Sequence, residues 1–342
     1  MWDRFLRACR REPVDATPVW FMRQAGRYMP EYRAIRQKRT LLEICKAPEL
    51  ATEVTLQPVR ALGVDAAILF ADILLPLEPM GAPFEFAAGE GPRFFESVRD
   101  ADAVERLRLI DPEDSLAYVL SAIRMIRAEL DGKVPLIGFA GAPFTLASYL
   151  VEGGKSASFA VTKRLMYREP AVWSALMGKL AEVVRRYLRA QVAAGAQAVQ
   201  LFDSWVGELS PIDYREYVMP HVRHILSDVQ SLGVPVIHFG TGTAMLLDVM
   251  KEAGGTVIGV DTFTPLDWAR QRLGSSVALQ GNLEPLLLGA PRDLLARRVD
   301  DVLARAGTSP GHIFNLGHGI LPETPPEAVK YVVDYVHERT AR

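Results

Sequence analysis

The strongest indication of a fold lies between residues 236 and 316, where four short apolar runs follow one another. They read Val-Ile-His-Phe at 236–239, Val-Ile-Gly-Val at 257–260, Val-Ala-Leu-Gln at 277–280 and Ile-Phe-Asn-Leu at 313–316. Short runs of this kind, bounded by glycine, proline or polar residues, are typical of strands buried on both faces of a sheet. A few tens of residues separate them, which suits a helical crossover between parallel strands. This half of the chain therefore predicts repeated βα units.

Four similar runs come earlier, so the chain contains eight predicted strands. The earlier runs occupy residues 19–21, 66–70, 136–139 and 198–202. Eight strands that alternate with helices favour an α/β fold closed as a single (β/α)8 TIM barrel over an open doubly wound sheet. The first three intervals are longer and predict βα-loop insertions, while the residues before the first strand form an N-terminal extension. Because no Gly/Ser-rich linker interrupts the chain, residues 1–342 are expected to form one barrel domain.

The clearest connecting helix is predicted between residues 172 and 192. Apolar residues recur there at every fourth position, namely Val172, Leu176, Leu180, Val184, Leu188 and Val192. The other faces of the same segment carry Lys179, Glu182, Arg185 and Arg186. The helix is therefore expected to pack one face on the sheet and to expose the other.

Composition and charge exclude several classes of protein. Of the 342 residues, 49% are hydrophobic and 23% are charged, and 39 basic against 41 acidic residues give a net charge of −2. This balance provides a core and suggests neither a nucleic-acid-binding nor a membrane-surface protein. The first residues lack the apolar core of a secretory signal, and the apolar run 66–77 is broken by Asp72 and too short to span a membrane. With Cys9 and Cys45 as the only cysteines, we expect no disulfide framework, no cysteine-based metal site and a cytoplasmic location.

The active site of a parallel barrel lies at the carboxyl ends of its strands, where the βα loops converge. After the first predicted strand, residues 23–39 hold six basic side chains against Glu31 alone. Arg23 and Arg27 form an Arg-x-x-x-Arg pair in this first loop, and arginine presents a planar fork of donors that binds carboxylate or phosphate. We therefore expect these two to bind an anionic substrate. The basic residues from 33 to 39 fit better a solvated face that pairs with acidic residues elsewhere.

Asp72 interrupts an apolar stretch after the second predicted strand. A buried carboxylate needs partners, because its desolvation is costly. A structural aspartate that caps a loop or pairs with an arginine explains it as well as a functional one does. Pyrrole or amine donors on a ligand would serve as partners equally well.

Further polar residues follow the other strands. Tyr149 comes shortly after the third strand and Ser204 directly after the fourth; the sequence around Ser204 lacks the glycines of a nucleophile elbow, which leaves a hydrogen-bonding role. His318 lies between Gly317 and Gly319 after the last strand, and glycines there would let the ring approach a ligand closely. A histidine that only closes the end of the barrel is the alternative.

Several familiar motifs fail on inspection. The stretch 153–156 (Gly-Gly-Lys-Ser) resembles the end of a phosphate-binding loop, but its first glycine is replaced by Tyr149. The stretch 240–242 (Gly-Thr-Gly) lacks the third glycine of a dinucleotide fingerprint, which leaves only weak anion binding by its amides. His221 and His224 have no carboxylate or cysteine at zinc spacing, so they are expected to be surface or packing histidines.

Six blocks, in this order along the chain, resemble the uroporphyrinogen decarboxylase family. The three longest read Pro-Val-Trp-Phe-Met-Arg-Gln-Ala-Gly-Arg-Tyr at 18–28, Gly-Phe-Ala-Gly-Ala-Pro-Phe-Thr-Leu at 138–146 and Phe-Asn-Leu-Gly-His-Gly-Ile at 314–320. Shorter ones lie at 70–74, 202–204 and 280–283. The likeness runs from Trp20 to near the C-terminus.

This resemblance implies a (β/α)8 enzyme of haem biosynthesis, without cofactor or metal and usually a homodimer. It would convert uroporphyrinogen III to coproporphyrinogen III by removing four acetate carboxyl groups. By motif position, the expected catalytic residues are Asp72, Arg23, Tyr149 and His318. The expected substrate-binding residues are Arg23, Gln24, Arg27, Asp72, Tyr149, Ser204 and His318.

The implied reaction needs no electron-sink cofactor, because a pyrrole protonated at a ring carbon is itself an electron sink. The protein then supplies position, a proton and a negative charge beside the cation, and Asp72 is the expected source of that charge. The proton donor is left open among Asp72, an arginine-held water, Tyr149 and His318.

Two rival functions compete with this interpretation. Zinc-dependent methyltransferases resemble the same family, but Phe239 and Gly240 follow His238 and no cysteine occurs beyond Cys45, so a His-x-Cys zinc set cannot form there. A non-catalytic carrier of tetrapyrroles or other anions could use the same basic loop. A single-turnover assay would distinguish carrier from enzyme.

Overall fold

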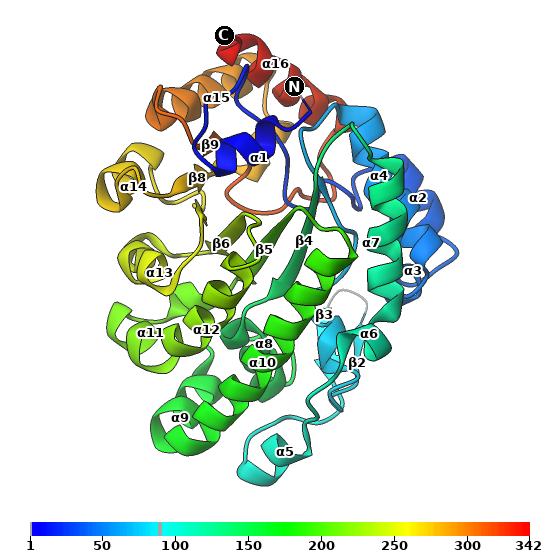
Figure 1. The fold of residues 1–342 in the computed structure, drawn as a ribbon, viewed down its shortest axis with the longest axis vertical. Coiled ribbons are helices and arrows are strands. Elements are labelled where there is room, and N and C mark those ends of the chain that lie inside the picture. The colour runs from blue at the N-terminus through cyan, green and yellow to red at the C-terminus, as the bar shows by residue number, and fades with distance from the viewer. Residues whose placement is uncertain (1, 88–90) are drawn as a thin grey trace.

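A curled parallel sheet of seven strands forms the centre of the computed structural model, which describes residues 2–87 and 91–342 (Figure 1). Its order is β1 (Ala67–Ile68), β4 (Leu136–Gly141), β5 (Ala198–Asp203), β6 (Val236–Gly240), β7 (Val257–Gly259), β8 (Ala278–Gln280) and β9 (His312–Ile313). Every neighbouring pair is parallel. All strands therefore end at the same edge of the sheet, the carboxyl edge.

Helices surround this sheet on its outer side (Figure 1). The longer ones are α4 (Pro48–Leu62), α7 (Ala117–Glu129), α8 (Pro143–Glu152), α9 (Ala160–Arg168), α10 (Pro170–Ala194), α12 (Met219–Gln230), α14 (Leu266–Leu273), α15 (Arg292–Ala306) and α16 (Pro326–Thr340). The shorter ones are α1 (Arg4–Cys9), α2 (Pro30–Arg36), α3 (Leu41–Cys45), α5 (Ala101–Arg106), α6 (Pro112–Ser115), α11 (Pro211–Tyr217) and α13 (Leu247–Ala253), with single 3-10 turns at Leu75–Leu77, Val206–Glu208, Ala244–Leu246 and Pro285–Gly289. Many begin with proline, whose fixed φ and missing N–H suit the first turn of a helix.

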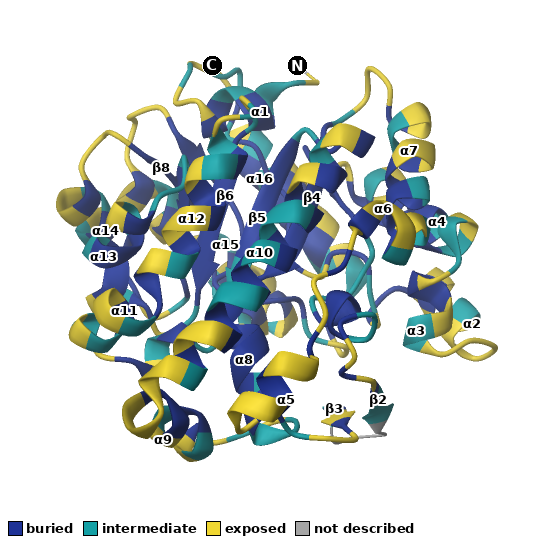
Figure 2. Cartoon of the chain, turned by 60° about the horizontal axis from the view of Figure 1, so that its bottom comes forward, coloured by how far each residue is buried: buried dark blue, intermediate teal, exposed yellow. Residues whose placement is uncertain are grey.

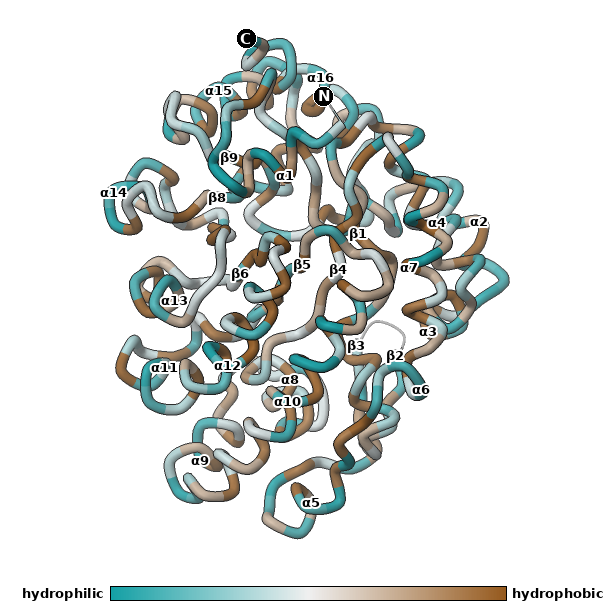
Figure 3. Tube along the Cα trace, in the orientation of Figure 1, coloured by the Kyte–Doolittle hydropathy of each residue, from teal (hydrophilic) through white to brown (hydrophobic). Residues whose placement is uncertain are grey.

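The helix predicted from the apolar stripe at 172–192 is confirmed as α10. Leu176, Leu180, Val184 and Leu188 are fully buried, and α10 packs on β4 and β5. Figure 2 shows buried and exposed bands running along this helix, and Figure 3 shows the matching alternation of hydropathy. Among the helices of residues 2–87 and 91–342, none is long and apolar enough to cross a membrane.

The predicted first strand, residues 19–21, forms only an isolated parallel bridge between Val19 and Phe314. Regular pairing with β1 would need the backbone amides of this segment, but side chains accept from two of them. The Val19 amide donates to Asp65 at 2.7 Å, and the Phe21 amide donates to Gln24 at 3.0 Å. The segment nevertheless lies between the two end strands. The Phe314 amide donates to the Pro18 carbonyl (2.9 Å), and the Asp65 amide donates to the Val19 carbonyl (2.8 Å).

The long interval between β1 and β4 contains an antiparallel hairpin that the sequence did not predict. Its strands are β2 (Phe84–Ala87) and β3 (Gly91–Phe94). Three helices, α5 to α7, follow it before β4 begins. The hairpin contacts the sequence after α8, because Arg93 bridges to Gly154 and the Phe94 amide donates to the Gly153 carbonyl at 3.0 Å.

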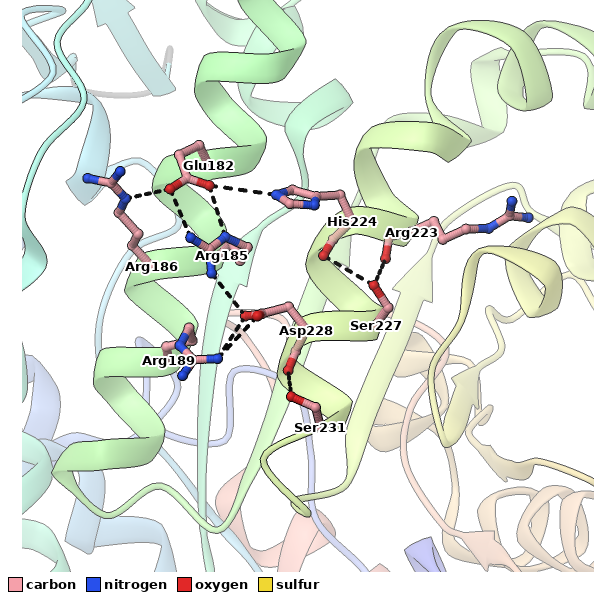
Figure 4. A network of polar contacts seen from close by, with 9 residues as sticks. All are labelled: Glu182, Arg185, Arg186, Arg189, Arg223, His224, Ser227, Asp228 and Ser231. Carbon is pink, nitrogen blue, oxygen red and sulfur yellow. Dashed lines mark hydrogen bonds and ion pairs between the residues drawn. The ribbon is translucent and has the colours of Figure 1, made fainter.

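On the outer surface, a network of charges joins α10 to α12 (Figure 4). Glu182 accepts from Arg185 and Arg186 at 2.9 and 2.6 Å. Asp228 of α12 accepts from Arg189 at 3.1 Å and lies 3.3 Å from Arg185. These contacts hold the pKa of Glu182 at about 2, and hydrogen bonding from Arg185 is the largest cause. Arg185, Arg186 and Arg189 thus each have a carboxylate partner.

Candidate active site

The carboxyl edge gathers the side chains that the sequence singled out. Arg23 and Arg27 lie in the loop before α2, which we call the first loop, and Asp72 follows β1. Tyr149 lies on α8 after β4, Ser204 follows β5, and His318 follows β9.. Asp72 and Arg23 interact electrostatically with Tyr149, and Arg23 also does so with His318. The parallel topology thus brings Arg23, Asp72, Tyr149 and His318 together.

Asp72 is half-buried at the end of the apolar β1 segment. One carboxylate oxygen accepts a hydrogen bond from the Leu74 amide at 2.8 Å, as in the turn of a capped loop. Burial raises the pKa of Asp72, while the Leu74 amide and the charge of Arg23 lower it. Among the described residues, no ion pair neutralises this carboxylate. Asp72 is therefore a desolvated carboxylate that can accept further hydrogen bonds.

Arg23 and Arg27 are exposed, and neither side chain has a hydrogen bond or ion pair within residues 2–87 and 91–342. Arg23 adopts φ +62°, a left-handed conformation that is uncommon for a residue with a side chain. Its aliphatic part packs over Gly319, where a Cβ atom would lie 2.5 Å from the Arg23 Cδ. The arginine is thereby positioned while its guanidinium stays free.

His318 has an exposed ring whose Nδ1 accepts a hydrogen bond from the Gly319 amide at 2.8 Å. Partial desolvation, followed by the charge of Arg23, lowers its pKa. The neutral ring therefore carries its proton on Nε2. The glycines beside His318 allow other parts of the protein, and not a ligand, to approach the backbone closely. A Cβ atom on Gly317 would lie 2.1 Å from the Thr262 amide nitrogen.

Tyr149 is half-buried on α8, and burial raises its pKa, with the negative charge of Asp72 as the second cause. Its ring packs edge-on against Trp205 with centroids 5.9 Å apart. Ser204, beside Trp205, is half-buried, and its carbonyl accepts a hydrogen bond from the Thr241 hydroxyl. Both side chains thus border the loop that follows β5.

Gln24 differs from its neighbours, because it is fully buried. Its oxygen accepts from the Phe21 amide, and its NH₂ donates to the Ala66 carbonyl at 2.9 Å. The NH₂ end therefore ties the first loop to the residue before β1, and the oxygen end fixes the turn within the loop's own segment. This geometry favours support of Arg23 over direct contact with a substrate.

Three aromatic rings that the sequence did not single out as site residues lie side by side at the ends of β4, β5 and β6. Phe139 meets Phe202 edge-on at 5.5 Å, and Phe202 meets Phe239 at 5.9 Å. Phe139 and Gln200 are register partners, and Gln200 lies two residues before Phe202, so these side chains share one face of the sheet. Phe139 and Phe239 are buried, so only the Phe202 ring is partly exposed at these strand ends, backed by the other two.

Two weaker sequence hypotheses can be compared with the structure. The amide of Gly242 donates to the Asp261 carboxylate, so a protein group already occupies this donor of the 240–242 loop. Across the part of the chain that the structure describes, no cluster of three or more His, Cys, Asp or Glu residues has the geometry to hold a metal. His221 and His224 both lie on α12, as expected for packing and surface residues.

A parallel α/β sheet whose carboxyl edge carries a desolvated carboxylate and two arginines that are unpaired among the described residues defines the class: an α/β enzyme fold. The family model described as uroporphyrinogen decarboxylase (URO-D) matches residues 2–339. The chain belongs to the uroporphyrinogen decarboxylase family.

Similar proteins agree with this assignment. The chain is 71% identical to uroporphyrinogen decarboxylase of Sorangium cellulosum, over 98% of this chain and 96% of that protein. It is 57% identical to uroporphyrinogen decarboxylase of Carboxydothermus hydrogenoformans, over 99% and 97% of the two chains. A solved methyltransferase from Methanosarcina mazei has a similar fold, with a TM-score of 0.79 at 23% identity over 98% of each chain.

Proposed function

We propose that this protein decarboxylates uroporphyrinogen III to coproporphyrinogen III, releasing four molecules of carbon dioxide in haem biosynthesis. The observation that carries the proposal is the family match over residues 2–339, together with the side chains at the carboxyl edge. The substrate is a ring of four pyrroles with eight carboxylates. It needs cationic partners at its rim and a carboxylate near its N–H groups.

The first-loop arginines, Arg23 and Arg27, are suited to bind the substrate's carboxylates. Both lack a protein partner among the described residues, so substrate binding breaks no existing ion pair. Arginine binds a carboxylate through two parallel hydrogen bonds. Gln24 supports the loop from beneath, while the partly exposed Phe202 ring, backed by the buried Phe139 and Phe239, offers an apolar contact to the macrocycle.

Asp72 is suited to accept hydrogen bonds from the pyrrole N–H groups and to stabilise the cation. In each round, a proton adds to the pyrrole carbon next to the one that bears an acetate arm, so that the carbon bearing the arm becomes part of the cationic π system. The bond between the methylene and the carboxylate then breaks, its electrons neutralise the ring, and carbon dioxide leaves. A second proton converts the exocyclic methylene to a methyl group, and the first proton then leaves the ring carbon, which restores the neutral pyrrole. A fixed negative charge beside the cation lowers the barrier to the first step.

Tyr149, Ser204 and His318 complete the proposed site as hydrogen-bond donors. The lowered pKa of His318 keeps it neutral near pH 7, so its Nε2–H suits a substrate carboxylate better than it suits protonation of a ring carbon. Burial raises the pKa values of Asp72 and Tyr149, and both residues stay candidates for the donor of the proton that the ring receives. Comparing the pH profiles of Asp72→Asn and Tyr149→Phe would separate these two as the proton donor.

We also propose that residues 1–342 form one closed (β/α)8 domain. The backbone hydrogen bonds of Pro18 and Val19, which reach β9 on one side and the start of β1 on the other, support closure of the seven-stranded sheet by this segment. Asp65 reinforces the same junction through the Val19 amide and Arg4 (3.0 Å). Hydrogen exchange tests this proposal: the Trp20 and Phe314 amides should exchange as slowly as amides of β5.

Homodimer formation is a further part of the proposal. Met245, Phe263 and Leu286 are 65%, 82% and 65% exposed on three successive loops at the carboxyl edge. Clusters of exposed large apolar side chains mark interaction surfaces. Light scattering should give a mass of two chains for the wild type and of one chain for Phe263→Glu.

The direct test is anaerobic incubation of chelator-treated protein with uroporphyrinogen III, followed by chromatography of the oxidised porphyrins. The proposal predicts products with seven, six, five and finally four carboxyl groups. Substrate that binds and remains unaltered in single turnover would favour the anion carrier instead. Absence of both binding and turnover would contradict the proposed substrate.

A further inference from the structure

Behind the proposed site, the Thr145 hydroxyl joins helix α8 to the loop that follows β5. This hydroxyl donates to the Asp203 carboxylate at 2.9 Å and accepts from the Trp205 amide at 3.3 Å. Thr145 and Asp203 are both fully buried. A single side chain of α8 thus holds the end of β5 and the first residues beyond it.

Trp205 contacts α8 a second time through its ring. Tyr149 lies four residues after Thr145, so the two side chains share one face of the helix. The Trp205 ring packs edge-on against Tyr149, with centroids 5.9 Å apart and planes inclined by 67°. Trp205 therefore touches Thr145 with its backbone and Tyr149 with its ring, and Ser204 lies between this contact and β5.

Asp203 fixes the rotamer of Thr145. Ala142, the N-cap residue of α8, provides no side-chain cap, and the Asp203 carboxylate from β5 accepts from both the amide and the hydroxyl of Thr145. Burial raises the pKa of Asp203 to about 7, while the two Thr145 hydrogen bonds oppose that rise. Its second oxygen has no partner within the described residues. Burying such a group is costly, and simple packing of α8 on β5 would not require it.

We propose that Thr145, oriented by Asp203, is a positioning residue for the decarboxylation. It sets the distance between α8 and the 204–205 loop, and so fixes the Tyr149 phenol and the Ser204 hydroxyl relative to the substrate. The inference rests on the proposed function. Misplacement of a reacting group by about 1 Å can reduce turnover by about 100-fold, which is the scale on which such a residue acts.

The test compares steady-state decarboxylation by Thr145→Val, Thr145→Ser and Ser148→Ala. Valine keeps the shape of threonine and removes both hydrogen bonds, whereas serine keeps the hydroxyl. Ser148 is the matched control: it is a fully buried hydroxyl of the same helix, and it donates only within α8, to the Phe144 carbonyl at 2.8 Å. Melting temperatures of all variants are measured in parallel.

We expect T145V to lower kcat about 10-fold with less than about a twofold change in KM, because the first-loop arginines that bind the carboxylates do not depend on Thr145. T145S should stay within about threefold of wild type, and S148A should keep wild-type kcat even if its melting temperature falls. Should T145V not fold, Thr145→Ala and T145S are compared well below their melting temperatures, with the same expected contrast.

Wild-type kcat in a folded T145V protein would overturn the proposal, as would equal impairment of T145S and T145V. Equal loss of kcat in S148A and T145V would reduce Thr145 to a general packing residue and would also overturn it. Failure of the wild-type protein to decarboxylate uroporphyrinogen III in the same assay would instead contradict the proposed function. The two failures are therefore distinguishable.

Discussion

The arginines of α10 and the arginines of the first loop differ in what surrounds them. On α10, Arg185, Arg186 and Arg189 each lie within 3.3 Å of a carboxylate oxygen and form the continuous network of Figure 4. In the first loop, Arg23 and Arg27 have no carboxylate partner among the described residues. Both groups contain the same side chain, but one group is neutralised by the protein and the other is not.

This difference separates charges that hold the fold together from charges that are kept for a ligand. Paired surface charges contribute modestly to stability, and a network contributes more than an isolated pair. An unpaired arginine contributes little to the fold, but its donors are free for an incoming carboxylate. Substitutions in the two groups should therefore have different effects on stability and on turnover.

The largest effect is expected for Asp72→Asn, which removes the negative charge beside the unpaired Arg23 and preserves the shape. Turnover should fall by about 100- to 1000-fold while substrate affinity changes much less, because the charge matters most when the pyrrole is cationic. Single-turnover rates and equilibrium binding measure the two quantities separately. Unchanged turnover would remove Asp72 from the mechanism.

Glu182→Gln should destabilise the fold by about 1 kcal/mol at pH 7 and leave turnover unchanged. Because the folded-state pKa of Glu182 is about 2 and below its ordinary value of 4.5, its contribution is present above pH 4.5 and is lost as the pH falls towards 2. Urea unfolding at several pH values measures this: wild type and variant should differ at pH 7 and converge at low pH. Glu53→Gln is the control, because the single ion pair of Glu53 among the described residues is with the exposed Arg60 at 2.9 Å.

A smaller effect is expected for the basic residues that follow the first loop. Arg33, Lys38 and Arg39 are exposed and have no ion pair among the described residues, contrary to the pairing that the sequence favoured. Replacing all three by glutamine should lower kcat/KM about threefold at low ionic strength and leave kcat unchanged, because unpaired positive charge speeds encounter with a polyanion. The same substitutions at Arg186 and Arg189 should have no such effect. A loss that persists in high salt would argue against steering.

Much of the architecture could be predicted from the sequence, because buried strands and α10 leave local patterns. Residues 19–21 show the limit: the pattern is that of a strand, but the Val19 amide is taken by Asp65, 46 residues away. The interaction depends on how the chain folds back, and no local window contains it. The hairpin of β2 and β3 was missed because its short strands lie inside an insertion.

The site residues could be predicted because polar side chains at strand ends stand out against apolar runs. Their surroundings could not. Gly319 can pack against Arg23 only because the segment after the last strand lies beside the first loop. Thr145 can bind Asp203 only because α8 packs next to the end of β5. The signal for Asp203 was present, since a carboxylate ends an apolar strand, but its partner was visible only in three dimensions.

The most direct test of the account is a crossed comparison of Arg23→Gln and Arg185→Gln, with kcat/KM for uroporphyrinogen III and urea stability measured for both. We predict that Arg23→Gln loses about 100-fold in kcat/KM with unchanged stability, since it removes charge-assisted hydrogen bonds to the substrate and none to the residues that the structure describes. Arg185→Gln should lose stability and keep wild-type kcat/KM. If Arg23→Gln instead destabilised the fold, or turned over substrate as the wild type does, the division between the two groups of arginines would be wrong.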